Sequence, residues 1–337
     1  MAATSRPASP PQLRDTAPFL AADVGGTHVR LGRVQASGDP SHPIEVLDYR
    51  KYRCADYLSL AAILADFLRD NPGLTDCVIA SAGYPLADGT VITNNLPWVL
   101  SPREIRAELG LDSVHLVNDF EAVAHAAAYV DASEVLQLTG PVQVPRAPTL
   151  VLGPGTGLGA AVWIPNEGRP VVLATEAGQA ALATNTELEM ELVRVMLRQR
   201  SHVPIEHALS GPGLLNLYNA LCVVRGAAAA HATPDAITAA ALAGDDALAR
   251  ESLDVFCGLL GSAVGDMALL YGAQGGIYLA GGILPKIRQF LIDSSFVQRF
   301  LDKGTMREAL ERIPVKLVEH GQLGVVGAAS WFLGHKP

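Results

Sequence analysis

Two glycine-containing segments with the same pattern constrain the fold of this chain more than any other feature. The first, FLAADVGGTHVRLGRVQ (19–35), reads as an apolar strand, a turn at Gly25–Gly26 and a second strand. The second, TLVLGPGTGLGAAVWIP (149–165), begins about 130 residues later and follows the same order. Two matching elements this far apart predict two domains built from one duplicated core. The length of 337 residues also suits two domains.

Strand-like and helix-like patterns alternate along the rest of the chain. Strand patterns lie at 78–81, 114–117, 276–282 and 315–320. Helical patterns lie at 58–70, 101–110, 187–200, 213–224, 234–243 and 246–271, with two further helices beginning at Leu284 and near Val325. This alternation predicts an α/β class with mixed sheets. We expect a small α/β domain from 19–129 plus 320–337 and a large one from 130–319.

Composition narrows the class of function. The chain has 34 acidic and 25 basic residues, a net charge of −9, which argues against general binding to nucleic acid or anionic membranes. We expect no stretch that is apolar and long enough to span a bilayer. Met1–Pro18, rich in Pro, Ala and Ser, is expected to be a disordered tail and lacks a signal-peptide pattern. The four cysteines lack zinc-ligand spacing and predict buried free thiols in a reducing cytoplasm: Cys54, Cys77, Cys222 and Cys257.

The DVGGT turn (23–27) is the first candidate for chemistry. Its glycines let the backbone approach a ligand closely, and Thr27 adds hydroxyl and amide donors. Asp23, at the end of the strand, could hold Mg²⁺ through water, because magnesium prefers oxygen ligands. An ordinary hairpin turn with the same residues is the alternative.

The LGPGTGLGA segment (152–160) formally matches a dinucleotide-binding glycine pattern. That pattern requires a helix directly after the glycines, and here the β-type run AAVWIP follows. A glycine loop between two strands, with amides that bind a phosphate, fits better. A purely structural turn remains the alternative.

Two further segments are ambiguous taken alone. In NDFEAVAHA (118–126), Asn118 or Asp119 could cap a helix, or a carboxylate at the strand end could be a general base. GGIYLAGG (275–282) ends in a turn whose bare backbone could accept an adenine or a sugar.

Taken together, five motifs carry a family resemblance. DVGGT, NDF, GPGTGLG, LSGPGLLNLY (209–218) and LAGGILP (279–285), in this order, resemble bacterial-type glucokinases of the hexokinase/actin-like superfamily. The resemblance extends from Phe19 to Leu333. It implies a two-domain actin-like ATPase (ribonuclease H-like) fold with a central cleft. The cysteine-rich CxCGxxGC zinc motif of the related repressor and open-reading-frame kinases does not occur in the sequence.

The resemblance also implies residue roles. It makes Asp119 the general base of an ATP- and Mg²⁺-dependent kinase acting on glucose, and it allows a homodimer. The implied sugar ligands are Asn95, Asn118, Glu176, Gln179 and Glu206. The implied ATP and phosphate ligands are Asp23, Gly25, Gly26, Thr27, Gly155, Thr156, Gly157, Gly281 and Gly282, with Asp23 beside the metal.

Two departures from the family pattern bear on the substrate. EAGQ (176–179) stands where relatives have EGGH, so Gln179 replaces a sugar-binding histidine, and His28 stands where Asn is common. A carboxamide both donates and accepts hydrogen bonds, so sugar binding can persist with a changed preference. The rival interpretations are a kinase for another hexose such as mannose or an amino sugar, a glucose-binding regulator with slow turnover, and an actin-like filament or chaperone ATPase. ADP and polyphosphate remain alternative donors, because backbone amides bind phosphates and not the base.

Overall fold

The computed structural model describes residues 17–39, 42–85, 91–92, 96, 98–127, 129–130, 134–167, 170–319 and 321–335. Apart from its last two residues, the expected tail Met1–Pro18 lies outside these ranges. The chain divides into two compact units. Unit 1 comprises Met1–Tyr129, Asn166–Val171 and Gln322–Pro337, and unit 2 comprises Val130–Pro165 and Val172–Gly321.

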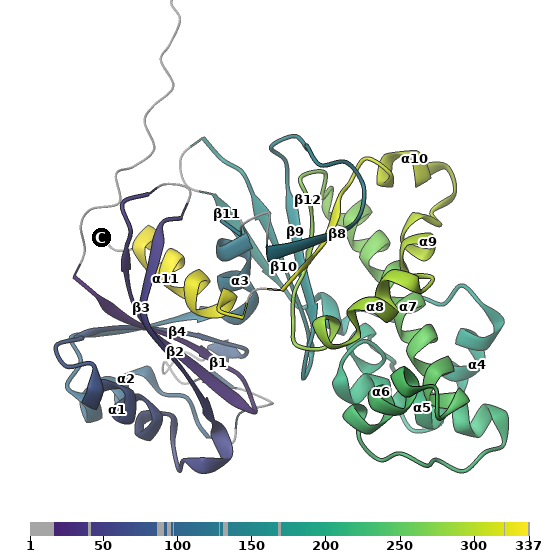
Figure 1. Ribbon diagram of the computed structural model, residues 1–337, viewed down its shortest axis with the longest axis horizontal. Coiled ribbons are helices and arrows are strands. Elements are labelled where there is room, and N and C mark those ends of the chain that lie inside the picture. The colour runs from purple at the N-terminus through teal and green to yellow at the C-terminus, as the bar shows by residue number, and fades with distance from the viewer. Residues whose placement is uncertain are drawn as a thin grey trace, which may run out of the picture. The chain divides into compact units, whose positions relative to one another are not determined.

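Unit 1 is built on a five-stranded sheet in the order β3-β2-β1-β4-β7 (Figure 1). The strands are β1 (Phe19–Val24), β2 (His28–Ala36), β3 (Ile44–Arg53), β4 (Asp76–Ser81) and β7 (Ser113–Asn118). β1 and β3 each pair antiparallel with β2, whereas β1, β4 and β7 run parallel. The first glycine segment therefore folds as the predicted strand, turn and strand.

Helices cover both faces of this sheet. They are α1 (Leu60–Asp70), α2 (Pro102–Leu109), α3 (Asp119–Ala127) and α11 (Leu323–His335), with a short η1 (Cys54–Asp56) and a two-stranded sheet of β5 (Tyr84–Pro85) and β6 (Val91–Ile92). Leu20 packs in the core under α1 and α2, and the next residue, Ala21, packs in the core under α3 and α11. This follows from strand geometry, because successive side chains point to opposite faces.

Unit 2 is built on a six-stranded sheet in the order β11-β10-β9-β12-β13-β8. The strands are β8 (Val135–Thr139), β9 (Thr149–Pro154), β10 (Leu158–Ile164), β11 (Val171–Thr175), β12 (Gly276–Leu279) and β13 (Val315–Val318). β9 pairs antiparallel with β10, and β9, β12 and β13 are parallel. The five strands from β11 to β13 thus repeat the order of the unit 1 sheet, with the second glycine turn in the same place as the first.

The helices of unit 2 enclose a large apolar core with this sheet. They are α4 (Glu187–Met196), α5 (Gly211–Arg225), α6 (Pro234–Ala243), α7 (Ala247–Tyr271), α8 (Arg288–Asp293), α9 (Phe296–Leu301) and α10 (Arg307–Leu310), with η3 (Ala177–Gln179), η4 (Ile205–His207), η5 (Leu284–Ile287) and η6 (Gly304–Met306). The helix predicted from Leu284 is a 3₁₀ turn before α8, and the predicted 187–200 helix ends four residues early. All four cysteines are buried free thiols, as predicted.

The expectation that no stretch is apolar and long enough to span a bilayer was wrong. Helix α7 has 25 residues and a mean hydropathy of 1.6, which is enough by length and composition to cross a membrane. In unit 2, however, 72% of its apolar window is buried. Leu253, Phe256 and Leu260 of α7 belong to the core of that unit, so the apolar character of the helix is explained by packing.

Candidate active site

Three parallel strands of unit 1 end at one edge of the sheet. In their register, Val24 of β1 lies opposite Ser81 of β4, and Ser81 lies opposite Asn118 of β7. The DVGGT turn therefore begins in the same row in which Asn118 ends its strand. Such carboxyl edges of parallel strands are where open α/β folds bind ligands. Buried Ser81, in the middle of the row, was missed by the motif analysis, because one serine after an apolar run has no distinguishing pattern.

The β1–β2 turn is held by backbone hydrogen bonds at both ends. The amide of Gly25 donates to the carbonyl of His28 at 3.0 Å, and the amide of Cys54 donates to the carbonyl of Thr27 at 3.0 Å. The Cys54 thiol also donates to the Gly25 carbonyl at 3.3 Å. Thr27 itself is exposed. Cys54, directly after β3, therefore holds the turn through two hydrogen bonds, and the exposed tip at Thr27 stays accessible to a ligand.

Asp23 is enclosed on two sides. Nη1 of Arg30 donates to its Oδ2 at 3.0 Å, and Gly324 of α11 packs against the carboxyl group. Burial raises the pKa of Asp23 above its ordinary value, and the charge of Arg30 partly offsets this. One carboxylate oxygen is thus committed to Arg30, a residue that the motif analysis did not single out. Asp23 with its oxygen ligands still fits the chemistry of a water-mediated Mg²⁺ contact, which remains a proposal.

Asn118 takes the capping role that the sequence left open between Asn118 and Asp119, and the general-base role stays a prediction. Oδ1 of Asn118 accepts from the amides of Phe120 at 3.0 Å and Glu121 at 3.1 Å, so Asn118 caps α3. Asp119 is the first residue of α3 and is half-buried at the sheet edge. Its Oδ1 also accepts from the amide of Phe120, at 2.9 Å. The helix start therefore orients the carboxylate in the row that contains the glycine turn.

In unit 2, the turn between β9 and β10 is a tight loop. The amide of Gly155 donates to the carbonyl of Gly157 at 2.7 Å, and the amide of Gly211, at the start of α5, donates to the carbonyl of Gly155 at 2.8 Å. Within the described part of the chain, a Cβ built on Gly155 or on Gly282 would meet no atom within 4 Å. Packing therefore does not require glycine at these two positions. The open space suits a ligand that lies directly on the backbone, as a nucleotide phosphate or adenine does.

The LAGG turn lies next to this loop. A Cβ on Gly281 would lie 2.5 Å from the carbonyl oxygen of Pro154, and one on Gly153 would lie 2.7 Å from the carbonyl oxygen of Ala280. Gly281 also has φ of 92°, a conformation that favours glycine. The predicted phosphate loop and the predicted adenosine turn are therefore neighbours in unit 2. Gly211 and its cap Ser210 join them there; the motif LSGPG contained both, but no role had been assigned to either.

Glu206 lies against the predicted phosphate loop. Its Oε2 accepts from the amide of Leu158 at 2.8 Å, and a Cβ on Gly157 would lie 2.5 Å from the same oxygen. The absence of a side chain at Gly157 is what lets the carboxylate approach. Oε1 of Glu206 accepts from the side-chain amide of Gln179 at 3.3 Å. Two predicted sugar ligands thus contact each other, and one of them contacts the predicted phosphate loop.

The EAGQ segment is held beside Glu206 by its own glycine. Gly178 packs against the carbonyl oxygen of Leu158, which leaves no room for a larger residue. Residues 177–179 form η3, so the exposed Glu176 precedes this turn and the exposed Gln179 is its last residue. Nε2 of His202 lies 3.0 Å from the carbonyl oxygen of Gln179 and braces the turn from outside. Asn95, the remaining predicted sugar ligand, lies outside the described residues.

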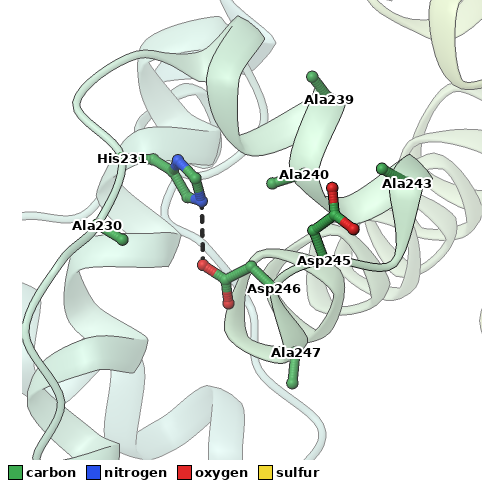
Figure 2. Close-up of a pocket in the computed structure, with 8 residues that line it drawn as sticks. All are labelled: Ala230, His231, Ala239, Ala240, Ala243, Asp245, Asp246 and Ala247. Atoms are coloured by element: carbon green, nitrogen blue, oxygen red, sulfur yellow. Dashed lines mark ion pairs between the residues drawn. The ribbon is translucent and has the colours of Figure 1, made fainter.

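A separate cavity in unit 2 has no link to these motifs. It has a volume of about 640 Å³ and opens beside the start of α7 (Figure 2). Two of its polar residues are already used by the fold, since Asp246 caps α7 through the amides of Leu248 and Ala249 and pairs with His231 at 3.0 Å. Its other lining residues are Ala230, Ala239, Ala240, Ala243, Asp245 and Ala247. None of the predicted site residues lines it.

Comparison with known sequences assigns the family. The family model described as Glucokinase matches residues 20–335. A glucokinase-like protein of Xylella fastidiosa is 61% identical over 318 residues, which cover 94% of this chain and 95% of that protein. A glucokinase of Saccharophagus degradans is 35% identical over 323 residues, which cover 93% of this chain and 98% of that protein.

Solved structures agree. A glucokinase from an Antarctic psychrotroph matches with a TM-score of 0.81 at 33% identity, covering 94% of this chain and 98% of that one. A ROK family glucokinase from Streptomyces griseus, solved in complex with glucose and AMPPNP, shares the fold with a TM-score of 0.65 at 20% identity, covering 94% of this chain and 99% of that one. The α/β architecture with two sheets is therefore that of sugar kinases. This chain belongs to the glucokinase family.

Proposed function

We propose that this protein is an ATP-dependent glucokinase that phosphorylates the 6-hydroxyl of glucose. The observation that carries the proposal is Glu206, whose carboxylate accepts the amide of Leu158 at 2.8 Å and fills the space beside Gly157. A carboxylate suited to binding sugar hydroxyls thus lies against the loop whose amides suit phosphates. A hydrolytic carboxylate pair would leave the two glycine loops unexplained. The proposal includes an actin-like ATPase fold with a central cleft, and the two domains expected from the sequence.

Asp119 is the proposed general base. It accepts the proton of the 6-hydroxyl as that oxygen attacks the terminal phosphorus of ATP, while the start of α3 orients the carboxylate. The proposed sugar ligands bind the other hydroxyls: Asn95, Asn118, Glu176, Gln179 and Glu206. Hydroxyl-specific polar groups reject sugars that lack the matching hydroxyl, because the protein group is then left unpaired.

Backbone amides do most of the proposed phosphate binding. The Gly25–Thr27 turn and the Gly155–Gly157 loop offer amides, and Gly281–Gly282 provide a bare surface for adenosine. Bound Mg²⁺ would neutralise charge on the transferred phosphate, and Asp23 is the residue that would hold it. Arg30 keeps the Asp23 carboxylate in place through their 3.0 Å contact.

Relatives support both substrates without fixing the sugar. The Streptomyces griseus glucokinase was solved with glucose and AMPPNP, and the Xylella fastidiosa relative is named glucokinase-like. Gln179 is the residue that favours a second candidate, a kinase for another hexose such as mannose or an amino sugar. Its contact with Glu206, a proposed sugar ligand, supports this second candidate.

The test is turnover with Mg·ATP in a coupled assay that detects ADP, with glucose, mannose, glucosamine and fructose offered separately. Glucose-dependent ADP release with the highest kcat/KM on glucose supports the proposal. The highest kcat/KM on another hexose would transfer the function to that sugar. Glucose binding without turnover on any sugar would replace the kinase with a sugar-binding regulator.

A further inference from the structure

Four basic side chains meet on one face of the unit 1 sheet beside the DVGGT turn. In the antiparallel register of β2 and β3, His28 lies opposite Arg53 and Arg30 lies opposite Lys51. Directly paired residues point to the same face of a sheet, and residues two apart on one strand do so as well. We call these four residues, His28, Arg30, Lys51 and Arg53, the basic ladder.

The opposite face of the same strands is apolar. Val29, Leu31 and Tyr52, the residues that alternate with the ladder, are buried in the core under α1 and α2. The ladder therefore points to the face on which α11 lies, where Val325 packs against Gly32. Lys51 and Arg53 are exposed, and His28 and Arg30 are half-buried. The charges of Lys51, Arg30 and Arg53 help to lower the pKa of His28, after the larger effect of burial, so all three lie near its ring.

Fold stability does not account for this arrangement. Like charges placed directly opposite each other on neighbouring strands destabilise a sheet. Arg30 is compensated by a carboxylate, Asp23 at 3.0 Å. Over the residues that the structure describes, no ion pair joins Lys51 or Arg53 to an acidic group, although the chain as a whole carries a net charge of −9. Clustered charge of one sign raises the local concentration of oppositely charged ligands, so this cluster attracts anions.

The ladder is continuous with the turn proposed to bind phosphate. Arg53 is the last residue of β3, and the next residue, Cys54, donates its amide to the carbonyl of Thr27 at 3.0 Å. His28 directly follows Thr27 in the chain. The first basic pair, His28 and Arg53, thus lies directly beside the turn. The second pair, Arg30 and Lys51, lies next to it along the strands.

We propose that the basic ladder binds the oligophosphate tail of the phosphoryl donor, with Lys51 and Arg53 as the residues that attract it. This rests on the proposed kinase function for its role in turnover, but the anion site itself is independent of the sugar. Exposed charge pairs are weak singly and are screened by salt, so the two residues together account for about a tenfold preference for the ligand at low ionic strength. A longer or more highly charged phosphate chain gains the most binding affinity from the ladder.

The experiment measures binding of inorganic tripolyphosphate to the full chain by calorimetry, without sugar or nucleotide, at low and at high salt. The test variant is K51Q/R53Q. The control is R69Q/R103Q, which removes the same charge from exposed arginines of α1 and α2, on the opposite side of the sheet. We expect the dissociation constant for tripolyphosphate to rise about tenfold in K51Q/R53Q and to change less than twofold in R69Q/R103Q. The salt dependence of binding should be mostly lost in K51Q/R53Q and kept in R69Q/R103Q.

Kinetics separates this site from the proposed function. In K51Q/R53Q we expect KM for ATP to rise about tenfold, with KM for glucose and kcat nearly unchanged. The melting temperature should stay level or rise, because like-charge repulsion is removed. If tripolyphosphate binds the parent and K51Q/R53Q equally, or does not bind the parent, the ladder is not the site. If binding depends on the ladder but no hexose is phosphorylated, the anion site stands and the kinase proposal falls.

Discussion

The side-chain amide of Gln179 donates to Oε1 of Glu206 at 3.3 Å, and the amide of Leu158 donates to the other oxygen of the same carboxylate at 2.8 Å. The residue that departs from the family pattern is thus in contact with a proposed sugar ligand. A neutral carboxamide in this position orients Glu206 without a charge that changes with pH.

Removing this contact should weaken sugar binding with little effect on folding. Because Gln179 is exposed, the lost hydrogen bond to a charged group should cost about 1 kcal/mol, and Gln179→Ala should raise KM for glucose about fivefold. His202→Ala is the matched control, because among the described residues His202 contacts the backbone carbonyl of Gln179 and not its side chain. Steady-state kinetics at varied glucose decides, and equal KM values for Gln179→Ala and the parent would remove Gln179 from the sugar site.

The two glycines of the proposed phosphate loop, Gly155 and Gly157, should differ in the substrate whose binding they affect. In Gly157→Ala the new Cβ collides with Glu206, 2.5 Å away, so both sugar and nucleotide affinity should fall at least tenfold. In Gly155→Ala the new methyl group enters open space. That variant should fold normally and bind glucose normally while KM for ATP rises. Fluorescence titrations with each substrate, run separately, test this. A Gly157→Ala protein with normal glucose affinity would show that Glu206 does not bind the sugar.

Replacing the proposed base should stop the chemistry and leave binding intact. Asp119→Asn keeps an oxygen that can accept from the amide of Phe120, so α3 should still begin at the same residue. General-base catalysis contributes about a hundredfold or more, and kcat should fall at least that far. The control is Asp112→Asn, at an exposed carboxylate of the same unit. A kcat within threefold of the parent in Asp119→Asn would assign the base to another group.

The contact between α3 and α11 should be intolerant of any added side chain at Gly327. A Cβ there collides with the backbone of Ala122, so Gly327→Ala must separate the helices and should cost about 1–3 kcal/mol. Gly334 lies on the same helix, with no described atom within 4 Å of a Cβ, and Gly334→Ala should be neutral or slightly stabilising. Thermal unfolding compares the two. Since α3 begins with Asp119, kcat should also fall in Gly327→Ala.

Local signals predicted much of the fold. Ser101 and Gly110 bracket α2 as expected, because a serine cap and a left-handed glycine act within one helical turn. Helix α6 has the predicted bounds, Pro234–Ala243, since Thr233 caps it and Gly244 ends it. The glycine turns were equally clear, because each is flanked by two apolar strands.

Contacts between distant residues could not be predicted. Edge strands such as β3 and β8 have weak hydrophobic patterns and are defined by pairing with strands elsewhere in the chain. An example is the backbone hydrogen bond from the amide of Glu319 to the carbonyl of Glu134, beside the paired strands β13 and β8. The Gln179–Glu206 contact joins residues 27 positions apart, and its existence depends on where η3 and η4 pack. The sequence placed candidate residues in motifs, but only three-dimensional packing shows that Gly324 of α11 lies against the carboxyl group of Asp23.

Acid should destabilise the protein through His125. This side chain is buried in α3, and burial, with a smaller effect of His335, lowers its pKa from 6.5 to about 4. A lowered pKa means that His125 binds a proton less readily in the folded state than in the unfolded state. Its contribution to the free energy of unfolding is therefore complete above pH 6.5 and is lost as pH falls from 6.5 towards 4. His125→Gln cannot titrate. Its free energy of unfolding, compared with the parent, should therefore fall less between pH 7 and pH 4, by up to about 3 kcal/mol. Urea unfolding of both proteins at the two pH values measures this, with exposed His202→Gln as the control. Parallel pH profiles for parent and His125→Gln would show that the pKa of His125 is the same in the folded and the unfolded protein.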